Sequence, residues 1–321
     1  MRVDVATGAS RVLDTASSFD GEPCWTEDGG IVAGRARGAR HEYVEYRRAG
    51  TRRRLRRFDP ALHAMFGPGC VNVAEGPQRP NNADRTSLVV RPVAGGAAVA
   101  TLASSWPVGG TGLAWSADGR LLADVDDSRP RAAIRVTDVT TGRVVVRTPG
   151  PTTFARIPPG AVAPDGRALL VRQYGYADGG ALSEVAATIF DVAGGTFRDL
   201  VRHRFSAGGR TPGPEAWSPR GDLIAVVQAQ ELHLFDPAGA DLGTVRAGSR
   251  VRDIVWSPDG SRLAVQRLGR VRPGPVREYA REVVVVAAEP GARARTVFRD
   301  MRKDAMPAWS PDGRRLALVD D

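Results

Sequence analysis

The amino-acid sequence predicts an all-β fold, a seven-bladed β-propeller of four-stranded antiparallel blades. Three observations support this. The segment 255–265, VWSPDGSRLAV, recurs as a near copy over residues 308–318 and as weaker copies back to the N-terminus. A glycine stands at a constant distance after one position in every copy. Alternating apolar runs follow most copies and predict hairpins. Units of roughly 40–50 residues with four strands each are typical of propeller blades.

Each repeat is expected to begin with two strands joined by a tight turn. In the copy at 255–265, Ser257 suits the first position of a type I turn, Pro258 sets φ at the second, and Gly260 closes it. Leu263 and Val265 alternate with less apolar residues after the turn, as in a strand. The sequence therefore predicts strand, turn and strand.

Alignment of the copies gives seven anchor positions, one just before each turn. They are Trp25, Met65, Trp115, Val162, Trp217, Trp256 and Trp309. Four residues after each anchor comes Gly29, Gly69, Gly119, Gly166, Gly221, Gly260 or Gly313. A turn that enters the next strand through a positive φ favours a residue without Cβ. Seven anchors predict seven blades in one propeller domain over residues 1–321.

The outer half of each blade and the closure of the ring are also predicted. Segments 134–145, 188–200, 232–245 and 283–297 each read as a hairpin. Residues 4–8, DVATG, align with 138–142, DVTTG, so residues 1–14 resemble an outer hairpin without inner strands. Residues 308–321 provide inner strands without an outer hairpin. We expect the two ends of the chain to complete one blade.

The pattern W-S-P-D-G-x-x-L-A, complete from Trp256 to Ala264, resembles the WD40-like (PD40) repeat of TolB-like propellers. The same repeat occurs in propeller domains of prolyl oligopeptidase-like peptidases. The resemblance covers nearly the whole chain and is specific for the repeat, whereas a fold of this kind hosts many unrelated functions. Resemblance to TolB implies an envelope role in assemblies with lipoproteins, although nothing in the sequence resembles the separate N-terminal domain of TolB.

Motifs of catalysis and cofactor binding are missing from the sequence. It contains no G-x-S-x-G nucleophile elbow, P-loop or dinucleotide-binding fingerprint. Its four histidines, His41, His63, His203 and His233, lack metal-ligand spacing. The acidic group Asp124, Asp126 and Asp127 lacks the spacing of a calcium loop. The sequence therefore predicts no catalytic residue, no metal site and no cofactor.

We expect a non-enzymatic scaffold that binds a protein or peptide through its longer loops. In a propeller, the second-to-third and inter-blade connections share one face, and here they are long and varied. The candidate binding residues on this face are Trp106, Arg129, Arg131, Arg172, Tyr174, Tyr176, Arg272 and Tyr279. Simple solvent exposure of long loops explains the same residues equally well. The enzymatic alternative is a small-molecule hydrolase or lactonase that uses carboxylates at the mouth of the channel.

The formal net charge of +9 is carried almost entirely by arginine. The densest run, between Arg47 and Arg57, falls on the expected outermost strand of blade one. Charges on such a strand prevent unwanted edge-to-edge pairing, which is the interpretation we favour. A binder of anionic surfaces is the other interpretation. Few aromatic residues are interleaved with the arginines, so a nucleic-acid partner is not favoured.

Compartment and assembly are weakly constrained by the sequence. No apolar run reaches the roughly 20 residues of a membrane-spanning helix. The segment MRVDV at the start lacks the layout of a signal peptide, which favours a cytoplasmic location, or a periplasmic or other extracytoplasmic one if an upstream segment is missing. We expect a monomer. Cys24 and Cys70 fall on neighbouring predicted blades, where two buried free thiols are favoured over a disulfide.

Overall fold

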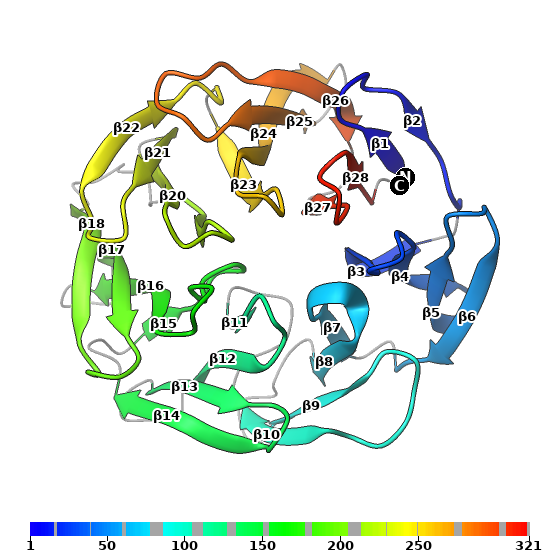
Figure 1. Cartoon of the computed structure of the whole chain (residues 1–321), viewed down its shortest axis with the longest axis horizontal. Helices are drawn as coiled ribbons and strands as arrows, with labels where there is room; N and C mark the ends of the chain where they lie inside the picture. The colour runs from blue at the N-terminus through cyan, green and yellow to red at the C-terminus, as the bar shows by residue number, and fades with distance from the viewer. Residues whose placement is uncertain are drawn as a thin grey trace.

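The computed structural model describes residues 1–15, 18–38, 40–59, 62–77, 86–104, 112–126, 133–149, 154–176, 182–204, 213–228, 230–248, 250–272, 278–301 and 306–319. Its strands form seven four-stranded antiparallel sheets. The sheets stand around a central axis as blades, and the two chain ends lie side by side (Figure 1). The predicted seven-bladed propeller is therefore confirmed.

Six blades are continuous in sequence, each running from its innermost to its outermost strand. Blade one contains β3 (Ser18–Trp25), β4 (Ile31–Arg37), β5 (Arg40–Tyr46) and β6 (Arg52–Arg57). Blade two contains β7 (Leu62–Phe66), the short 3-10 helix η1 (Pro68–Cys70), β8 (Asn72–Pro77), β9 (Thr86–Pro92) and β10 (Ala100–Ser104). Blade three contains β11 (Leu113–Trp115), β12 (Leu121–Asp126), β13 (Ala133–Asp138) and β14 (Arg143–Pro149).

The next three blades repeat this order. Blade four contains β15 (Phe154–Arg156), β16 (Ala168–Tyr176), β17 (Leu182–Asp191) and β18 (Phe197–Arg204). Blade five contains β19 (Glu215–Trp217), β20 (Ile224–Gln228), β21 (Glu231–Phe235) and β22 (Asp241–Val245). Blade six contains β23 (Val251–Trp256), β24 (Arg262–Arg272), β25 (Glu278–Ala287) and β26 (Arg295–Met301). The four outer hairpins expected from the sequence are all present.

Blade seven joins the two ends of the chain, as predicted. Its inner strands are β27 (Ala308–Trp309) and β28 (Arg315–Ala317), and its outer strands are β1 (Arg2–Asp4) and β2 (Ser10–Arg11). Strand β1 pairs with β28 in the register Val3 to Leu316. The N–H of Leu318 donates to the carbonyl of Met1 at 2.9 Å. These hydrogen bonds remove the free edge that β28 would otherwise present.

The repeated turn has the expected geometry. In blade six the N–H of Gly260 donates to the carbonyl of Ser257 at 2.9 Å, and Gly260 has a φ of +65°. The Ser257 hydroxyl donates to Oδ1 of Asp259 at 2.6 Å and accepts from the N–H of Arg262 at 3.0 Å. One serine and one aspartate therefore tie the turn to the start of the second strand.

Four anchor tryptophans link neighbouring blades. The indole N–H of Trp256 donates to the carbonyl of Ala216 at 3.1 Å, and that of Trp309 donates to the carbonyl of Val255 at 3.0 Å. Trp25 and Trp115 make the same bond to Ala308 and Met65. Each acceptor directly precedes the anchor of the previous blade. The repeat therefore fixes one blade against the next.

Blade two corrects the predicted alignment by one residue. The N–H of Cys70, rather than that of Gly69, donates to the turn carbonyl, here that of Gly67 at 3.1 Å. The anchor is therefore Phe66 instead of Met65, which agrees with the bond from Trp115 to Met65. Cys70 occupies the glycine position and has a φ of +56°. The alignment was wrong because the column holds glycine in every other blade, whereas here it holds Cys70. The neighbouring Gly69, which also has a positive φ, was taken for the column residue.

The core lies between the blades. The largest cluster of buried apolar side chains takes Ile134 from blade three, Leu169 from blade four and Ile224 from blade five. Each sheet therefore buries apolar residues on both faces, and burial of this kind is the main favourable contribution to folding. No helix among the described residues has the length and apolar character needed to cross a membrane.

Several candidate residues that we expected on long loops lie in strands. Residues 172–176 continue β16, with Tyr174 opposite Val185 in β17. Residues up to Arg272 continue β24, where Val271 lies opposite Tyr279 of β25. Arg172 and Tyr174 occupy alternate positions of β16, as residues on one face of a strand do, and the register with β17 shifts between Gly175 and Tyr176. The second and third strands of blades four and six are therefore longer than the sequence suggested.

Candidate functional site

A cavity of about 710 Å³ opens on the axis of the ring, on the face of the short turns. Its lining comes from blades one, two, three, four, six and seven, so it is shared by the ring. The apolar lining includes Pro23, Trp25, Met65, Phe66, Pro68, Val71, Trp115, Pro258, Trp309 and Pro311. The acidic lining is Glu22, Glu27 and Asp118. Cavities of this size, largely apolar with a few polar groups, are typical of ligand sites.

Glu22 is the carboxylate with the most perturbed environment in this cavity. It belongs to β3, just before a register shift between Asp20 and Cys24. The side chain is exposed to the axial cavity, and the surrounding blades limit its contact with bulk water. The resulting desolvation, together with the negative charge of Asp253 on β23, raises the pKa of Glu22 to about 7. Glu22 therefore changes charge near neutral pH.

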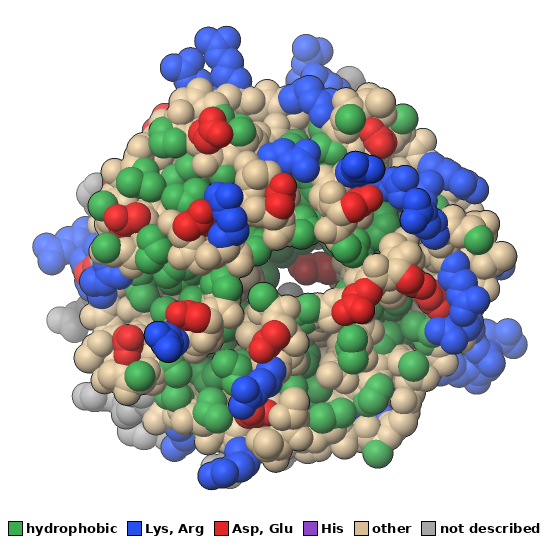
Figure 2. Space-filling model, in the orientation of Figure 1, with side chains coloured by type: hydrophobic (Ala, Val, Ile, Leu, Met, Phe, Trp, Pro, Cys, Tyr) green, Lys and Arg blue, Asp and Glu red, His purple; other side chains and the backbone are tan. Residues whose placement is uncertain are grey.

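A circle of turn carboxylates surrounds the opening, and Figure 2 shows acidic side chains spaced around it. Asp118, Asp259 and Asp312 each accept a hydrogen bond of 2.5–2.6 Å from the serine two residues earlier. These bonds lower the pKa of all three carboxyls, that of Asp259 to about 2. In blade five Arg220 replaces the turn aspartate, and Ser218 bonds Asp222 instead at 2.8 Å. Of these turn carboxylates, Asp118 lines the cavity itself, together with Glu22 and Glu27.

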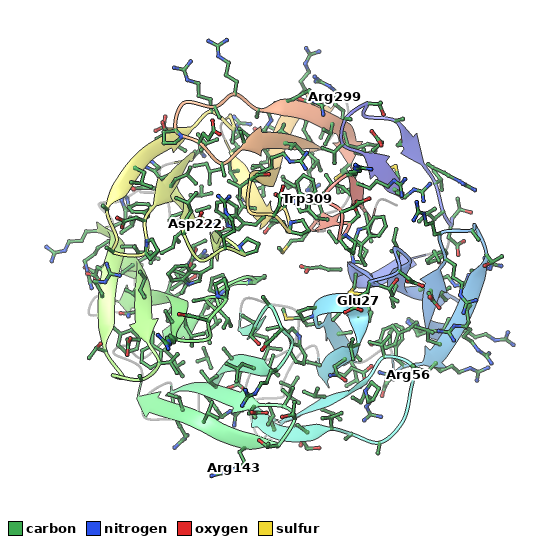
Figure 3. All side chains as sticks on the ribbon, in the orientation of Figure 1. Glu27, Arg56, Arg143, Asp222, Arg299 and Trp309 are labelled. Carbon is green, nitrogen blue, oxygen red and sulfur yellow. A yellow bond between two sulfur atoms is a disulfide. The ribbon has the colours of Figure 1, made fainter. Side chains whose placement is uncertain are left out.

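Arginine and lysine side chains also lie on this face, and some of them stand beside acidic side chains (Figure 2). Glu27 is near the central opening, whereas Arg56, Arg143 and Arg299 lie toward the circumference (Figure 3). Arginine and lysine side chains also project from the outline of the molecule in Figure 2. The chain has a net charge of +9, whereas the described lining of the axial cavity includes three carboxyl groups and no arginine or lysine. Cationic groups are attracted to the centre of this face.

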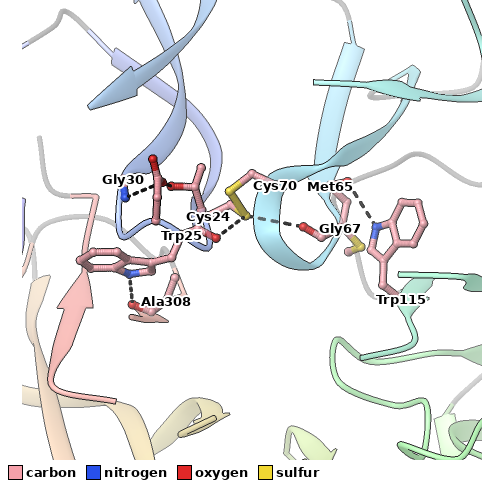
Figure 4. Close-up of a disulfide and its surroundings, with 10 residues drawn as sticks. Cys24, Trp25, Gly30, Met65, Gly67, Cys70, Trp115 and Ala308 are labelled. Carbon is pink, nitrogen blue, oxygen red and sulfur yellow. Dashed lines mark hydrogen bonds between the residues drawn. A yellow bond between two sulfur atoms is a disulfide. The ribbon is translucent and has the colours of Figure 1, made fainter. Parts of the chain in front are cut away.

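The two cysteines form a disulfide at the wall of the cavity, so the expectation of free thiols was wrong (Figure 4). Cys24 lies on β3 and Cys70 at the end of η1, with 5.8 Å between their Cα atoms. That separation is within the normal range for a disulfide. The sequence placed the cysteines on adjacent blades, but only the shifted alignment of blade two brings Cys70 opposite Cys24. The bond crosslinks blades one and two.

Of the predicted binding residues, Arg172 has a structural partner. It donates from Nε to Oε1 of Glu215 on the next blade at 3.1 Å, with a second contact between Nη2 and Oε2. Burial would lower the pKa of Arg172, but the charge of Glu215 outweighs burial and raises it. Burial raises the pKa of Glu215, and Arg172 opposes that rise. This buried pair joins blades four and five.

Two of the candidate binding residues, Tyr174 and Tyr279, are half-buried, and each has an arginine guanidinium over its ring. The Arg156 guanidinium lies 5.6 Å from the ring centre of Tyr174, and that of Arg250 lies 4.7 Å from the ring centre of Tyr279. Tyr176 and Arg272 end β16 and β24, on the long-loop side. Trp106, Arg129 and Arg131 lie outside the described residues. The candidates therefore stay a prediction, with Tyr174 and Tyr279 already in cation–π contacts.

The basic run on β6 is largely paired. Arg53 contacts Glu45 at 2.9 Å, Arg52 contacts Asp14 at 3.4 Å, and Arg56 contacts the buried Glu75 at 2.5 Å. In each pair the carboxylate is buried and the arginine is the more exposed partner, so the pairing reduces the charge available to a binding partner. An outer edge strand with charges balanced by its neighbours accounts for this run.

Metal ligands do not gather within the described part of the chain, where no group of three His, Cys, Asp or Glu side chains could hold an ion. Asp124, one of the acidic residues considered from the sequence, is buried and paired with Arg135 at 2.5 Å. The acidic residues at the axial cavity that sequence reasoning missed are Glu22 and Glu27. Glu22 lies outside the repeated columns, and Glu27 stands in the turn column that holds Pro258 in blade six, so the repeat gave no signal for either residue as a site.

No protein-family model matches the sequence, and a comparison with curated protein sequences also found no match. Solved structures with the same fold are numerous. An oligogalacturonate lyase in complex with manganese aligns with a TM-score of 0.63 at 15% identity, over 94% of this chain and 86% of that one. An oligogalacturonate lyase from Vibrio parahaemolyticus aligns with a TM-score of 0.61 at 15% identity, over 97% and 90%. A protein assigned as TolB from Agrobacterium tumefaciens aligns with a TM-score of 0.50 at 17% identity, over 99% and 96%. At these identities the likeness shows the fold alone, a β-propeller of the kind found in these structures.

Proposed function

We propose that this propeller is a non-enzymatic scaffold that binds a protein or peptide partner, with the axial cavity as its principal site. The observation that carries the proposal is the 710 Å³ cavity with aromatic and proline walls and an acidic rim. Its chemistry favours an extended segment that combines apolar side chains with a lysine, an arginine or an N-terminal amine.

The apolar walls supply most of the expected affinity. Trp25, Trp115 and Trp309 are held by hydrogen bonds to the preceding blades, so their rings are already ordered before a partner binds. Preordered aromatic surface costs little conformational entropy on binding. Pro68, Pro258 and Pro311 add rigid apolar surface between the rings. A partner would therefore gain contact area on a surface that needs little rearrangement.

The carboxylates are expected to select the charge of the partner. Glu22 lies within the cavity, and Glu27 and Asp118 lie toward its mouth. A cation placed beside Glu22 would favour its ionised form and lower its raised pKa. We therefore expect binding to strengthen as the pH rises through about 7. The long-loop face, with Tyr174 and Tyr279, is a second proposed surface for the partner.

Peptide selection followed by calorimetry tests the proposal. A random twelve-residue phage-displayed library would be selected on the immobilised protein, and synthetic copies of the recovered peptides measured in solution. We expect apolar sequences with at least one Lys or Arg, and a loss of about tenfold in affinity for Glu22→Gln. Arg143→Gln, at the outer edge, is the matched control and should have no effect. Binding that responds to Tyr279→Ala but not to Glu22→Gln would move the site to the long-loop face.

An enzymatic alternative is favoured by one observation. A carboxyl with a pKa of about 7 beside Asp253 in the channel suits general acid–base catalysis. Two solved structures of the same fold are named as oligogalacturonate lyases. Incubation with oligogalacturonates and with a panel of lactones is the direct assay. The scaffold proposal expects no turnover, whereas turnover that disappears in Glu22→Gln would support the enzyme.

The disulfide supports an oxidising compartment for this protein. Disulfides persist in periplasmic and extracellular proteins and are rare in reducing cytoplasm. We therefore propose an extracytoplasmic location over the cytoplasmic one. Thiol titration of the protein isolated from its native cells tests this, since Cys24 and Cys70 should be unreactive. Two reactive thiols in freshly isolated protein would return the proposal to the cytoplasm.

A further inference from the structure

A second hollow, of about 590 Å³, lies between blades four and five, away from the axial cavity. Turns of both blades and the outer strands of blade four surround it. The apolar part of its lining includes Ala168, Ile189 and Trp217, and the charged part consists of Asp165, Arg167, Asp191, Arg198 and Arg220. Nothing in the proposed function uses this hollow.

The hollow lies where blade four has a small residue in one column of the repeat. Six residues after its anchor, blade three has Leu121 and blade six has Arg262. Leu121 packs against the turn at Gly166 of the next blade. The Arg262 guanidinium carbon lies 5.2 Å from the ring centre of Trp309, and Nη2 of Arg262 donates to the carbonyl of Gly313 at 2.8 Å. Blade four has Ala168 in this column. The space beside Trp217 is therefore unfilled.

Trp217 differs from the other four anchor tryptophans, whose indole N–H groups all donate to the preceding blade. It is 7% exposed, and its indole Nε1 has no hydrogen-bond partner within the described residues. The preceding blade enters its anchor through Pro158, Pro159 and Gly160, and the Ala161 carbonyl already accepts from the N–H of Leu170 at 2.9 Å. A buried donor without an acceptor is costly, and such groups are uncommon in proteins.

Arginines give the hollow a positive edge. The Arg167 side chain has no ion pair or hydrogen bond in the described part of the chain. Arg198 is held across the junction by the carbonyls of Pro237, at 2.6 Å, and Ala238. Arg220 pairs with Asp222 at 2.9 Å, and the opposing carboxylates are Asp165 and Asp191. Asp165 accepts from the N–H of Arg167 at 2.9 Å, and Asp191 accepts from that of Gly194.

From these features we infer that the junction of blades four and five binds a small anionic molecule with a planar apolar part. Its carboxylate or phosphate contacts Arg167 and Arg198, and its planar part lies against Trp217 and Ile189. Arginine binds both oxyanions through paired, charge-assisted hydrogen bonds. Polar substituents of the ligand face Asp165 and Asp191. A volume of about 590 Å³ suits a molecule of metabolite size.

Nuclear magnetic resonance of the indole N–H groups provides the test, with phenyl phosphate as the probe. The Trp217 signal is assigned by its loss in Trp217→Phe, and its lack of an acceptor should place it upfield of the hydrogen-bonded indoles. Phenyl phosphate should shift this signal saturably and should bind more tightly than inorganic phosphate or benzyl alcohol. Benzoate, tested in parallel, separates carboxylate from phosphate preference.

Three variants locate the site. Arg167→Gln should weaken phenyl phosphate binding by about tenfold. Arg120→Gln is the matched control, because Arg120 has the same place in blade three and pairs there with Asp138 at 2.8 Å. Ala168→Leu supplies the side chain that blade three already has in this column, so it should fill the hollow and abolish binding. An unchanged melting temperature shows that each variant is folded.

Several results would overturn the inference. One is the absence of any shift of the Trp217 signal by either anion. Another is equal binding of benzyl alcohol and phenyl phosphate, because charge would then play no part. A third is equal weakening by Arg120→Gln and Arg167→Gln, which would show general attraction to a basic surface. If Ala168→Leu does not fold, the comparison of the two arginine variants decides alone.

Discussion

Blade six and blade two are copies of one repeat, yet they differ in what they do for the ring. Blade six has Trp256, the full serine and aspartate turn, and a hydrogen bond to the previous blade. Blade two has Phe66 as its anchor, no turn aspartate, and a disulfide in place of the tryptophan link. The conserved positions of the regular repeat, Trp256 and the turn residues, mainly hold the ring together. The degenerate copy supplies much of the wall of the axial cavity.

Blade four leads to the same conclusion. Its anchor is Val162, its turn lacks serine, and its small Ala168 leaves the hollow beside Trp217. The axial cavity and the hollow between blades four and five therefore both involve blades whose repeat has decayed. In a propeller the regular columns are structural, and departures from them are where to look for binding.

The largest expected effect separates a regular anchor from a degenerate one. Trp256→Ala removes a buried indole and should cost about 3–5 kcal/mol of unfolding free energy. Val162→Ala removes only two methyl groups and should cost about 2 kcal/mol, following the roughly 0.8 kcal/mol of each buried methylene plus a small cavity contribution. Denaturant melts of both variants check this. Similar losses would mean that the tryptophan column is not what holds the blades.

The disulfide is expected to replace the missing tryptophan link of blade two. Cys24→Ser should lower the free energy of unfolding by about 2–4 kcal/mol, because it opens a loop that spans 46 residues. Reductant should destabilise the native protein by a similar amount and leave Cys24→Ser unchanged. This substitution keeps Cys70, with its positive φ, in place. A native protein insensitive to reductant would show that blade two is held by packing alone.

A finer comparison concerns the indole hydrogen bond itself. Trp256→Phe leaves the carbonyl of Ala216 without its donor and should cost about 1 kcal/mol more than Trp217→Phe, which breaks no such bond. Chemical denaturation of the two variants measures the difference. Equal costs would indicate that Trp217 has an acceptor after all.

The smallest expected effect is the pH dependence of Glu22. Its folded pKa of about 7 lies above the ordinary value of 4.5, so the folded state binds this proton more tightly than the unfolded state. The stability gained from the proton is fully present below about pH 4.5 and is lost as the pH rises through about 7. Glu22→Gln should therefore gain stability relative to the native protein between pH 5 and 8. A constant difference over this range would place the pKa of Glu22 near its ordinary value.

Sequence reasoning succeeded where the physics is local and repeated. Turn chemistry at Ser257 to Gly260 and the match between residues 4–8 and 138–142 predicted the blades and the closure of the ring. It failed where one residue of register matters, as at Met65 and Phe66, and the disulfide was missed with it. Glu22 lies outside the repeat, and Glu27 departs from the proline of its turn column. Only the closed ring places them around one cavity, and only the comparison of blades reveals that Ala168 leaves a space.

Photo-crosslinking tests the central claim most directly. A selected peptide would be irradiated with two forms of the protein, one with p-benzoylphenylalanine in place of Val71 and one with it in place of Tyr176. Val71 is 62% exposed and lines the axial cavity, whereas Tyr176 ends β16 on the long-loop side. The account predicts a crosslink at position 71, reduced by Glu22→Gln, and none at position 176. A crosslink at position 176 alone would contradict it.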